Sequence, residues 1–175
     1  MSTLESLLKA TIRDIPDFPK PGILFKDITP VLARPDLLHA VTNHLAEVHG
    51  PDRIDAVVGM ESRGFIFGTP LAMALGAAFV PARKPGKLPY ERVSEEYALE
   101  YGTARLDMHI DAIKPGQRVL IVDDLIATGG TALATGNLVR RLGGIVVGYT
   151  FIIELSFLAG RGILTPVPVR AVVTY

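Results

Sequence analysis

The apolar residues of the chain recur at two spacings, which predict an alternation of helices and strands. Spacings of three and four residues predict a first helix that begins at Ser2 or Thr3 and continues to Ile15. The same spacings predict a second helix that begins at Pro35 and ends before Gly50. The buried stripe of this second helix is expected to consist of Leu38, Val41, Leu45 and Val48.

Continuous apolar runs predict strands that are buried on both faces of a parallel sheet. These runs cover residues 54–60, 119–122, 145–153 and 169–173. A loop beginning near Gly64, then a helix and a strand from Pro70 to Val80, are expected between the first two runs. This alternation predicts a doubly wound α/β core over residues 34–175. Ligands are expected at the carboxyl ends of its strands. Residues 1–33 are expected to form a separate N-terminal part of the same compact domain.

Strict alternation of polar and apolar residues predicts one β-hairpin. Residues 97–101 and 105–110 alternate in this way, and Gly102 supplies the turn between them. Before the hairpin, residues 84–94 are polar, basic and rich in Pro and Gly, which is typical of a functional loop.

Composition narrows the class of protein. The chain has 175 residues, of which 49% are hydrophobic, and no cysteine, which fits one well-buried cytoplasmic domain without disulfides. Its formal net charge is zero, which gives no electrostatic reason to expect a nucleic-acid partner. Residues 64–82 carry no charge, but Gly and Pro interrupt them, so we expect no membrane span. Neither a G-x-x-x-x-G-K-[ST] motif nor a G-x-G-x-x-G motif after a strand is present.

The richest chemistry lies in residues 119–131. Asp123 and Asp124 follow the apolar run, and both can reach one ligand only if the chain leaves the strand at Asp124. The five residues that follow can form an anion-binding nest whose backbone N–H groups converge before a helix that begins at Gly130 or Thr131. These five are Ala127, Thr128, Gly129, Gly130 and Thr131. A phosphate on the nest and sugar hydroxyls on the carboxylates would together bind a phosphorylated sugar. The alternative is a flavodoxin-like or receiver-type sheet whose acidic pair binds Mg²⁺ and whose glycines only form a turn.

The segment Val-Leu-Ile-Val-Asp-Asp-Leu-Ile-Ala-Thr-Gly-Gly-Thr resembles the phosphoribosyl-pyrophosphate (PRPP) loop of the type I phosphoribosyltransferases. The segments 18–30, 61–65, 83–89 and 99–102 resemble the members of this family that use adenine. The resemblance implies the family's fold, with residues 1–33 as a base-binding hood and a flexible loop or hairpin beside the core. It also implies a purine salvage enzyme that converts adenine and PRPP into AMP and pyrophosphate.

The resemblance also assigns site residues. Leu24 and Lys26 are expected to bind adenine through their backbones, and Phe25 is expected to stack on the ring. The nest of residues 127–131 is expected to hold the 5′-phosphate. Asp123 and Asp124 are expected to bind the ribose hydroxyls and stabilise the reacting centre. The residues expected to bind pyrophosphate are Arg63, Arg83, Lys84 and Lys87.

Three further expectations follow from the resemblance. Glu100 is expected to lie near adenine N7 as a general acid or base, the alternative being a solvent-facing strand residue. A non-proline cis peptide is expected between Glu61 and Ser62. Mg²⁺ is the expected cofactor, held mainly through PRPP rather than by protein ligands, and the protein is expected to be a homodimer.

Two other functions are left open by the sequence. One is a phosphoribosyltransferase for xanthine or hypoxanthine, against which the adenine-like hood argues. The other is a PRPP-sensing regulator that binds nucleic acid, which the neutral charge does not favour.

Overall fold

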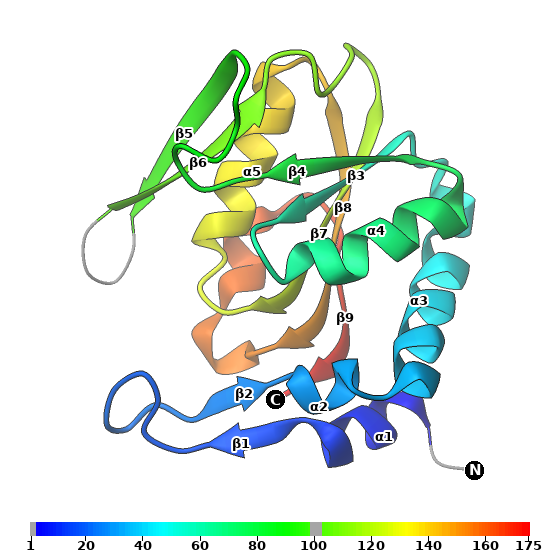
Figure 1. Ribbon diagram of the computed structural model, residues 1–175, viewed down its shortest axis with the longest axis vertical. Helices are drawn as coiled ribbons and strands as arrows, with labels where there is room; N and C mark the ends of the chain where they lie inside the picture. The colour runs from blue at the N-terminus through cyan, green and yellow to red at the C-terminus, as the bar shows by residue number, and fades with distance from the viewer. Residues whose placement is uncertain (1–2, 99–102) are drawn as a thin grey trace.

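The computed structural model describes residues 3–98 and 103–175 and is built around one parallel sheet of five strands (Figure 1). The strand order is β4-β3-β7-β8-β9, so the chain begins in the sheet interior and winds outward to both edges. This is the doubly wound arrangement that the sequence predicts. The strands are β3 (Ala56–Met60), β4 (Ala78–Ala82), β7 (Arg118–Ile126), β8 (Ile145–Glu154) and β9 (Val169–Thr174).

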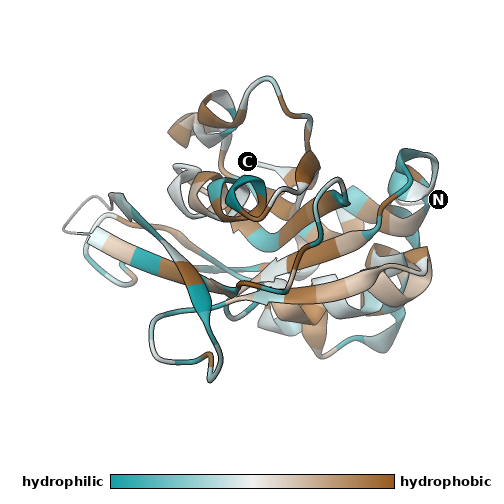
Figure 2. Cartoon of the chain, turned by 90° about the horizontal axis from the view of Figure 1, so that it is seen from above, coloured by the Kyte–Doolittle hydropathy of each residue, from teal (hydrophilic) through white to brown (hydrophobic). Residues whose placement is uncertain are grey.

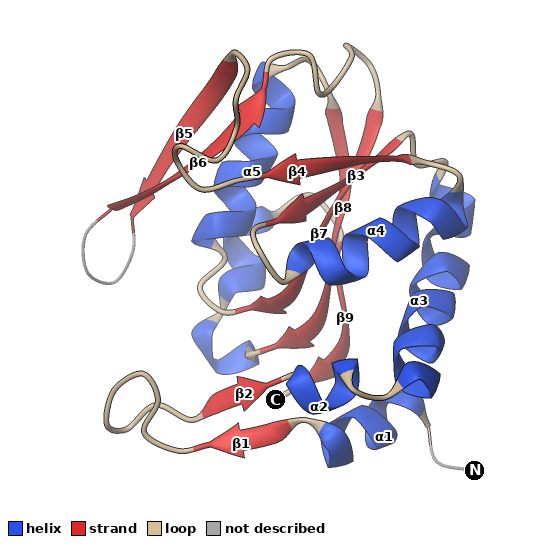
Figure 3. Cartoon of the chain, viewed as in Figure 1, coloured by secondary structure: helices blue, strands red, loops and turns tan. Residues whose placement is uncertain are grey.

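Helices cover both faces of this sheet and bury two hydrophobic clusters (Figure 3). Ile121 of β7 packs in the cluster beneath α5, whereas Leu120 and Val122 pack in the cluster beneath α3 and α4. Since both faces of β7 are buried, its residues 119–122 form an uninterrupted apolar run, and Figure 2 shows brown, hydrophobic segments in strands of the sheet. The three helices are α3 (Pro35–His49), α4 (Gly64–Leu75) and α5 (Gly130–Arg141).

The N-terminal part contains two short helices and a two-stranded antiparallel sheet. In Figure 1 it lies beside the β9 edge of the central sheet. Leu8, Ile12, Ile28 and Val31 of this part are buried in the same cluster as α3 and α4, so the hood and the core share apolar packing. Its elements are α1 (Leu4–Thr11), β1 (Arg13–Ile15), β2 (Phe25–Asp27) and α2 (Thr29–Leu32).

A hairpin of β5 (Arg92–Ala98) and β6 (Thr103–His109) projects beside α5, as the alternating pattern predicts. The prediction of a loop over residues 84–94 is wrong for its last three residues, because they pair with residues 107–109 of β6. Hydrogen bonds from Asn137 and Arg141 attach β5 to α5, including one from Arg141 Nη1 to Glu95 Oε2 at 3.3 Å. Asn137 Nδ2 donates to Glu95 Oε1 at 2.9 Å, and Arg141 Nη1 donates to the Ser94 carbonyl at 2.6 Å.

Two helix predictions near the N-terminus are wrong in detail. The first helix, capped by Thr3, ends at Thr11 rather than Ile15, because residues 13–15 pair with β2. In α3 the buried stripe includes Leu37 and His49, whereas Leu38 and Val48 are only half-buried.

The largest correction concerns α4, which begins at Gly64 and contains Pro70 in its interior. The sequence pattern places a loop there because glycine and proline usually interrupt helices. In the structure these glycines are points of close contact. A Cβ at Gly68 would lie 2.9 Å from the Phe79 ring, and one at Gly64 would lie 2.6 Å from the Val122 carbonyl oxygen. None of the helices in the described part of the chain is long and apolar enough to cross a membrane.

This close contact predicts that Gly64→Ala is destabilising. The added methyl group would press on the backbone of β7, which cannot move aside as a flexible side chain can. We expect the free energy of unfolding to fall by about 1–3 kcal/mol, as for other overpacked sites, measured by denaturant titration. Gly50→Ala is the matched control, because its φ is −52° and no atom lies within 4 Å of the new Cβ. Equal stability of the two variants would contradict the prediction.

Candidate active site

The candidate site lies where the strands β3, β4 and β7 end. The segment after β3 supplies Arg63, the residue after β4 is Arg83, and the end of β7 leads into the predicted nest. Because parallel strands end at one edge of the sheet, residues distant in sequence meet there.

The predicted nest has the backbone geometry of an anion site. Gly129 has φ of +83°, the left-handed conformation that favours glycine, and α5 begins at Gly130, as predicted. No side chain in the described residues caps this helix, and Gly129, Gly130 and Thr131 at its start line a cavity. Asp123, Thr128 and Thr131 are among the residues that line this cavity of about 100 Å³.

The acidic pair lies within the strand. β7 continues through Asp123 and Asp124 to Ile126, because β8 still pairs with it after the pairing with β3 has ended at Val122. The chain therefore does not leave the strand at Asp124, but the two carboxyl groups still interact directly with each other, so both can contact one ligand from within the strand. Asp123 lines the nest cavity, whereas Asp124 Oδ2 lies 2.9 Å from Arg63 Nε. The two carboxylates thus serve neighbouring parts of the site.

Burial controls the protonation of this pair. It raises the pKa of Asp123 well above its ordinary value, and the adjacent Asp124 raises it further. Burial also raises the pKa of Asp124, although the Arg63 guanidinium acts in the opposite direction. The backbone N–H of Asp124 donates to Asp123 Oδ1 at 2.8 Å and offers partial compensation. Two ionised carboxylates here need further hydrogen-bond donors, which sugar hydroxyls would supply.

Arg63 links the acidic pair to the hood. Its guanidinium carbon lies 5.6 Å from the centre of the Phe25 ring, and Phe18 packs edge-on against that ring at 5.1 Å. Leu24, beside Phe25, is exposed. The side chain of Lys26 points elsewhere, because its Nζ lies 2.6 Å from Asp14 Oδ1 and 3.9 Å from the centre of the Tyr175 ring. Lys26 can therefore contribute only backbone groups near Phe25.

The remaining predicted cations are dispersed. Arg83 Nε donates to Glu61 Oε2 at 3.2 Å, and the Lys84 backbone N–H donates to the same oxygen at 2.8 Å. Burial opposes ionisation of Glu61, but these contacts lower its pKa overall. Lys87 is exposed, and its carbonyl oxygen accepts from Arg83 Nη1 at 3.4 Å.

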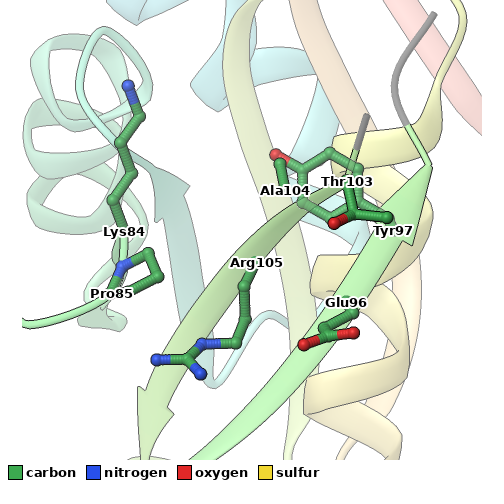
Figure 4. A pocket seen from close by; sticks show the side chains of 7 residues that line it. All are labelled: Lys84, Pro85, Glu96, Tyr97, Thr103, Ala104 and Arg105. Atoms are coloured by element: carbon green, nitrogen blue, oxygen red, sulfur yellow. The ribbon is translucent and has the colours of Figure 1, made fainter. Parts of the chain in front are cut away.

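Lys84 lines a different cavity, of about 460 Å³, between the β4 exit and the hairpin (Figure 4). Arg105 and Glu96, which are directly paired across β6 and β5, face it from the other side. The structure therefore brings together Arg63, the acidic pair, the nest and Phe25, and leaves Lys84 and Lys87 outside this group. Glu100 lies outside the described residues.

The donor set can accommodate Mg²⁺ only together with a ligand. Among residues 3–98 and 103–175, no three His, Cys, Asp or Glu side chains are arranged to hold a metal ion. One or two carboxylates plus substrate phosphates are the usual protein environment of Mg²⁺, and Asp123 and Asp124 can supply the carboxylates.

Comparisons with known proteins agree with this geometry. Residues 28–155 match the phosphoribosyl transferase domain family. The chain is 59% identical over 168 residues to adenine phosphoribosyltransferase of Acaryochloris marina, covering 96% of this chain and 99% of that protein. The crystal structure of adenine phosphoribosyltransferase from Thermoanaerobacter pseudethanolicus superposes with a TM-score of 0.96 at 51% identity, covering 99% of this chain and 100% of that one.

The chain belongs to the adenine phosphoribosyltransferase family. A more distant member, from Trypanosoma brucei, was crystallised with AMP, pyrophosphate and ribose-5-phosphate. It matches with a TM-score of 0.90 at 26% identity, covering 99% of this chain and 80% of that one. Family membership confirms the type I phosphoribosyltransferase fold and excludes the receiver-type alternative. The cis peptide between Glu61 and Ser62, expected from the resemblance to this family, is present.

Sequence reasoning missed two features of the site. It assigned no role to Glu61, which orients Arg83 and the backbone of Lys84. It also overlooked Gly160, whose carbonyl oxygen would lie 2.5 Å from a Cβ at Gly129. The only signal for Gly160 was its place in Gly-Arg-Gly, which reads as an ordinary turn.

The raised pKa of Asp123 predicts that Asp123→Asn stabilises the protein without ligand. A carboxyl group whose folded pKa is raised costs stability as the pH rises above 3.8, its ordinary value, and the full cost is present above the folded pKa. The variant should therefore be more stable than wild type at pH 8, and the gain should shrink toward pH 4.

Denaturant titrations across this pH range measure the effect. Asp36→Asn is the control of opposite sign, because a hydrogen bond from Arg34 lowers the pKa of that exposed carboxyl group. A variant at position 123 that is less stable than wild type at pH 8 would show that the carboxylate is adequately compensated.

Proposed function

We propose that this protein transfers the 5-phosphoribosyl group of PRPP to adenine, giving AMP and pyrophosphate in purine salvage. The proposal rests on the order in which the parts of the site adjoin one another: the nest adjoins the acidic pair, the acidic pair adjoins Arg63, and Arg63 adjoins Phe25. A phosphoribosylated base has its phosphate, ribose and base in the same order. The relative from Trypanosoma brucei binds AMP, pyrophosphate and ribose-5-phosphate, which supports the same assignment here.

The 5′-phosphate is assigned to residues 127–131. Backbone N–H groups at the start of α5, together with the hydroxyls of Thr128 and Thr131, bind its oxygens. Asp123 and Asp124 accept hydrogen bonds from the 2′- and 3′-hydroxyls of the ribose. As negative charges, they also stabilise the positive charge that develops on the ribose when its C1–O bond breaks.

The departing pyrophosphate is assigned to Arg63, Arg83, Lys84 and Lys87. Arg63 is already oriented by Asp124, and Arg83 by Glu61, so both guanidinium groups are held before the substrate arrives. Lys84 and Lys87 lie on the exposed segment after β4 and must move toward the ligand. Mg²⁺ bound to PRPP supplies further neutralisation of the phosphate charge.

Adenine is assigned to the hood. Phe25 presents its ring beside Arg63, and the backbones of Leu24 and Lys26 are the hydrogen-bonding groups for the edge of the base. Glu100 is proposed to exchange a proton with the base or to hold charge against it. Homodimerisation and a cytoplasmic location stay predictions.

A steady-state assay with four purine bases tests the function. With PRPP and Mg²⁺, we expect kcat/KM for adenine to exceed that for hypoxanthine, guanine and xanthine by roughly 10²–10⁴, because polar groups built for one base edge are left unpaired by another. Preference for an oxopurine would overturn the adenine assignment. Absence of turnover combined with binding of PRPP and of nucleic acid would favour the regulator alternative.

Glu100→Gln tests the role assigned to Glu100. The amide keeps the shape and one acceptor of Glu100 but cannot exchange a proton at neutral pH. If Glu100 acts in the transition state, kcat should fall by roughly 10²–10⁴ while the PRPP affinity stays unchanged. A higher KM for adenine at constant kcat would assign Glu100 to binding alone. Wild-type kinetics would return it to a solvent-facing strand residue.

A further inference from the structure

The phosphate nest has a wall behind it that comes from a distant part of the chain. This wall is a short 3₁₀ helix, η3 (Gly160–Leu164), which follows β8. A Cβ at Gly160 would lie 2.2 Å from the Ala127 carbonyl oxygen and 2.8 Å from the Gly129 nitrogen. The backbones of η3 and the nest are therefore in direct contact, and a displacement of η3 would change the shape of the nest.

The local chain gives η3 little rigidity of its own. It is a 3₁₀ helix of five residues, and such helices have poorer hydrogen-bond geometry than α-helices. Ala159 enters it with φ of +54°, a conformation that is unfavourable for a residue with a side chain. The position of η3 must therefore depend on contacts with the rest of the protein.

Arg161 makes the strongest of these contacts. Its Nε donates to Glu154 Oε1 at 2.9 Å, and its Nη2 donates to Glu154 Oε2 at 2.5 Å. Its Nη1 donates to the Val169 carbonyl oxygen at the start of β9. A two-pronged guanidinium–carboxylate pair is both strong and directional, so it fixes an orientation that a single contact would leave free.

The location of Glu154 explains why this pair acts on the nest. Glu154 is the last residue of β8 and pairs in register with Ile126, the last residue of β7 before the nest. Its carboxylate is 8% exposed, so it is itself held firmly by the sheet. Arg161 thus ties the wall to the strand end from which the nest begins.

We infer that Arg161 is a positioning residue for the 5′-phosphate site: its pair with Glu154 holds Gly160 against the nest and keeps the nest in its anion-binding shape. This inference rests on the proposed function of the nest. Arg161 makes no contact with the nest through its guanidinium group in the described structure, so it acts through the backbone of Gly160.

The test is Arg161→Gln, with ribose-5-phosphate as the probe in calorimetry and PRPP and adenine in steady-state kinetics. We expect the Kd for ribose-5-phosphate and the KM for PRPP to rise about tenfold, which corresponds to about 1.4 kcal/mol. The KM for adenine should change by less than about twofold, because nothing in the pair contacts the hood. Glu154→Gln should give the same rise, and the double variant should add little to either single change.

Arg170→Gln is the matched control. Arg170 has a side chain of similar exposure, 41% against 47%, and its Nη1 also donates to a carbonyl oxygen, that of Val48, near the carboxylate of Asp52. Arg170 lines one cavity together with Arg161, but its hydrogen bonds go to Val48, His49 and Asp52 rather than to η3. Its replacement should therefore lower stability without changing the ribose-5-phosphate Kd. Equal effects of the two variants on that Kd would overturn the inference, because a general loss of stability would then explain both.

Arg161→Lys serves if the glutamine variant does not fold. Lysine keeps the charge but loses the two-pronged geometry, so the Kd should rise by a smaller factor, about threefold, and an unchanged Kd would overturn the inference. The proposed function is tested separately by the wild type. A wild-type protein that neither binds ribose-5-phosphate nor uses PRPP contradicts the function, whereas normal wild-type binding with equal binding by the variants contradicts only the role of Arg161.

Discussion

The rest of the site depends on the burial of two adjacent carboxyl groups at the end of β7. Burial raises the pKa of both Asp123 and Asp124, although Arg63 and backbone N–H groups at Asp124 and Leu125 act in the opposite direction. This arrangement is costly for folding, and under the proposed function the ribose hydroxyls would supply further hydrogen-bond donors to the pair. Arg63 occupies its place because Gly64 allows the start of α4 to approach β7 closely.

Backbone contacts at glycine set the geometry around this pair. Gly64 lies against the Val122 carbonyl on one side of the site, and Gly129 lies against the Gly160 carbonyl on the other. In both places a side chain would separate two segments that must touch. Functional side chains such as Arg63 are therefore positioned by neighbours that have no side chain, and small displacements of the backbone reach the ligand-binding groups directly.

Hydrogen bonds connect this centre to the segment after β4 and to the β5–β6 hairpin. Glu61 orients Arg83 and the backbone of Lys84, so the cations proposed to bind pyrophosphate are arranged by an anion that follows the neighbouring strand. Glu95 and Ser94 attach the hairpin to α5 while Thr128 and Gly130 at the start of that helix line the cavity beneath it. The helix that begins at the nest thus also supports the hairpin.

The sequence by itself predicted the places of the core strands, although it ended β7 at Val122 rather than Ile126, and it limited the start of α5 to Gly130 or Thr131. These features depend on the conformational preferences or the burial of residues close together in the chain. It also determined the family, since the motif residues 119–131 are contiguous. It did not determine the start of α4, where glycines that interrupt an isolated helix become contacts with β7. Nor did it determine the pairing of Arg63 with Asp124, of Glu61 with Arg83, or of Arg161 with Glu154. Many side chains of opposite charge could pair along one chain, and only the packing of the strands and helices decides which of them are brought within a few ångströms.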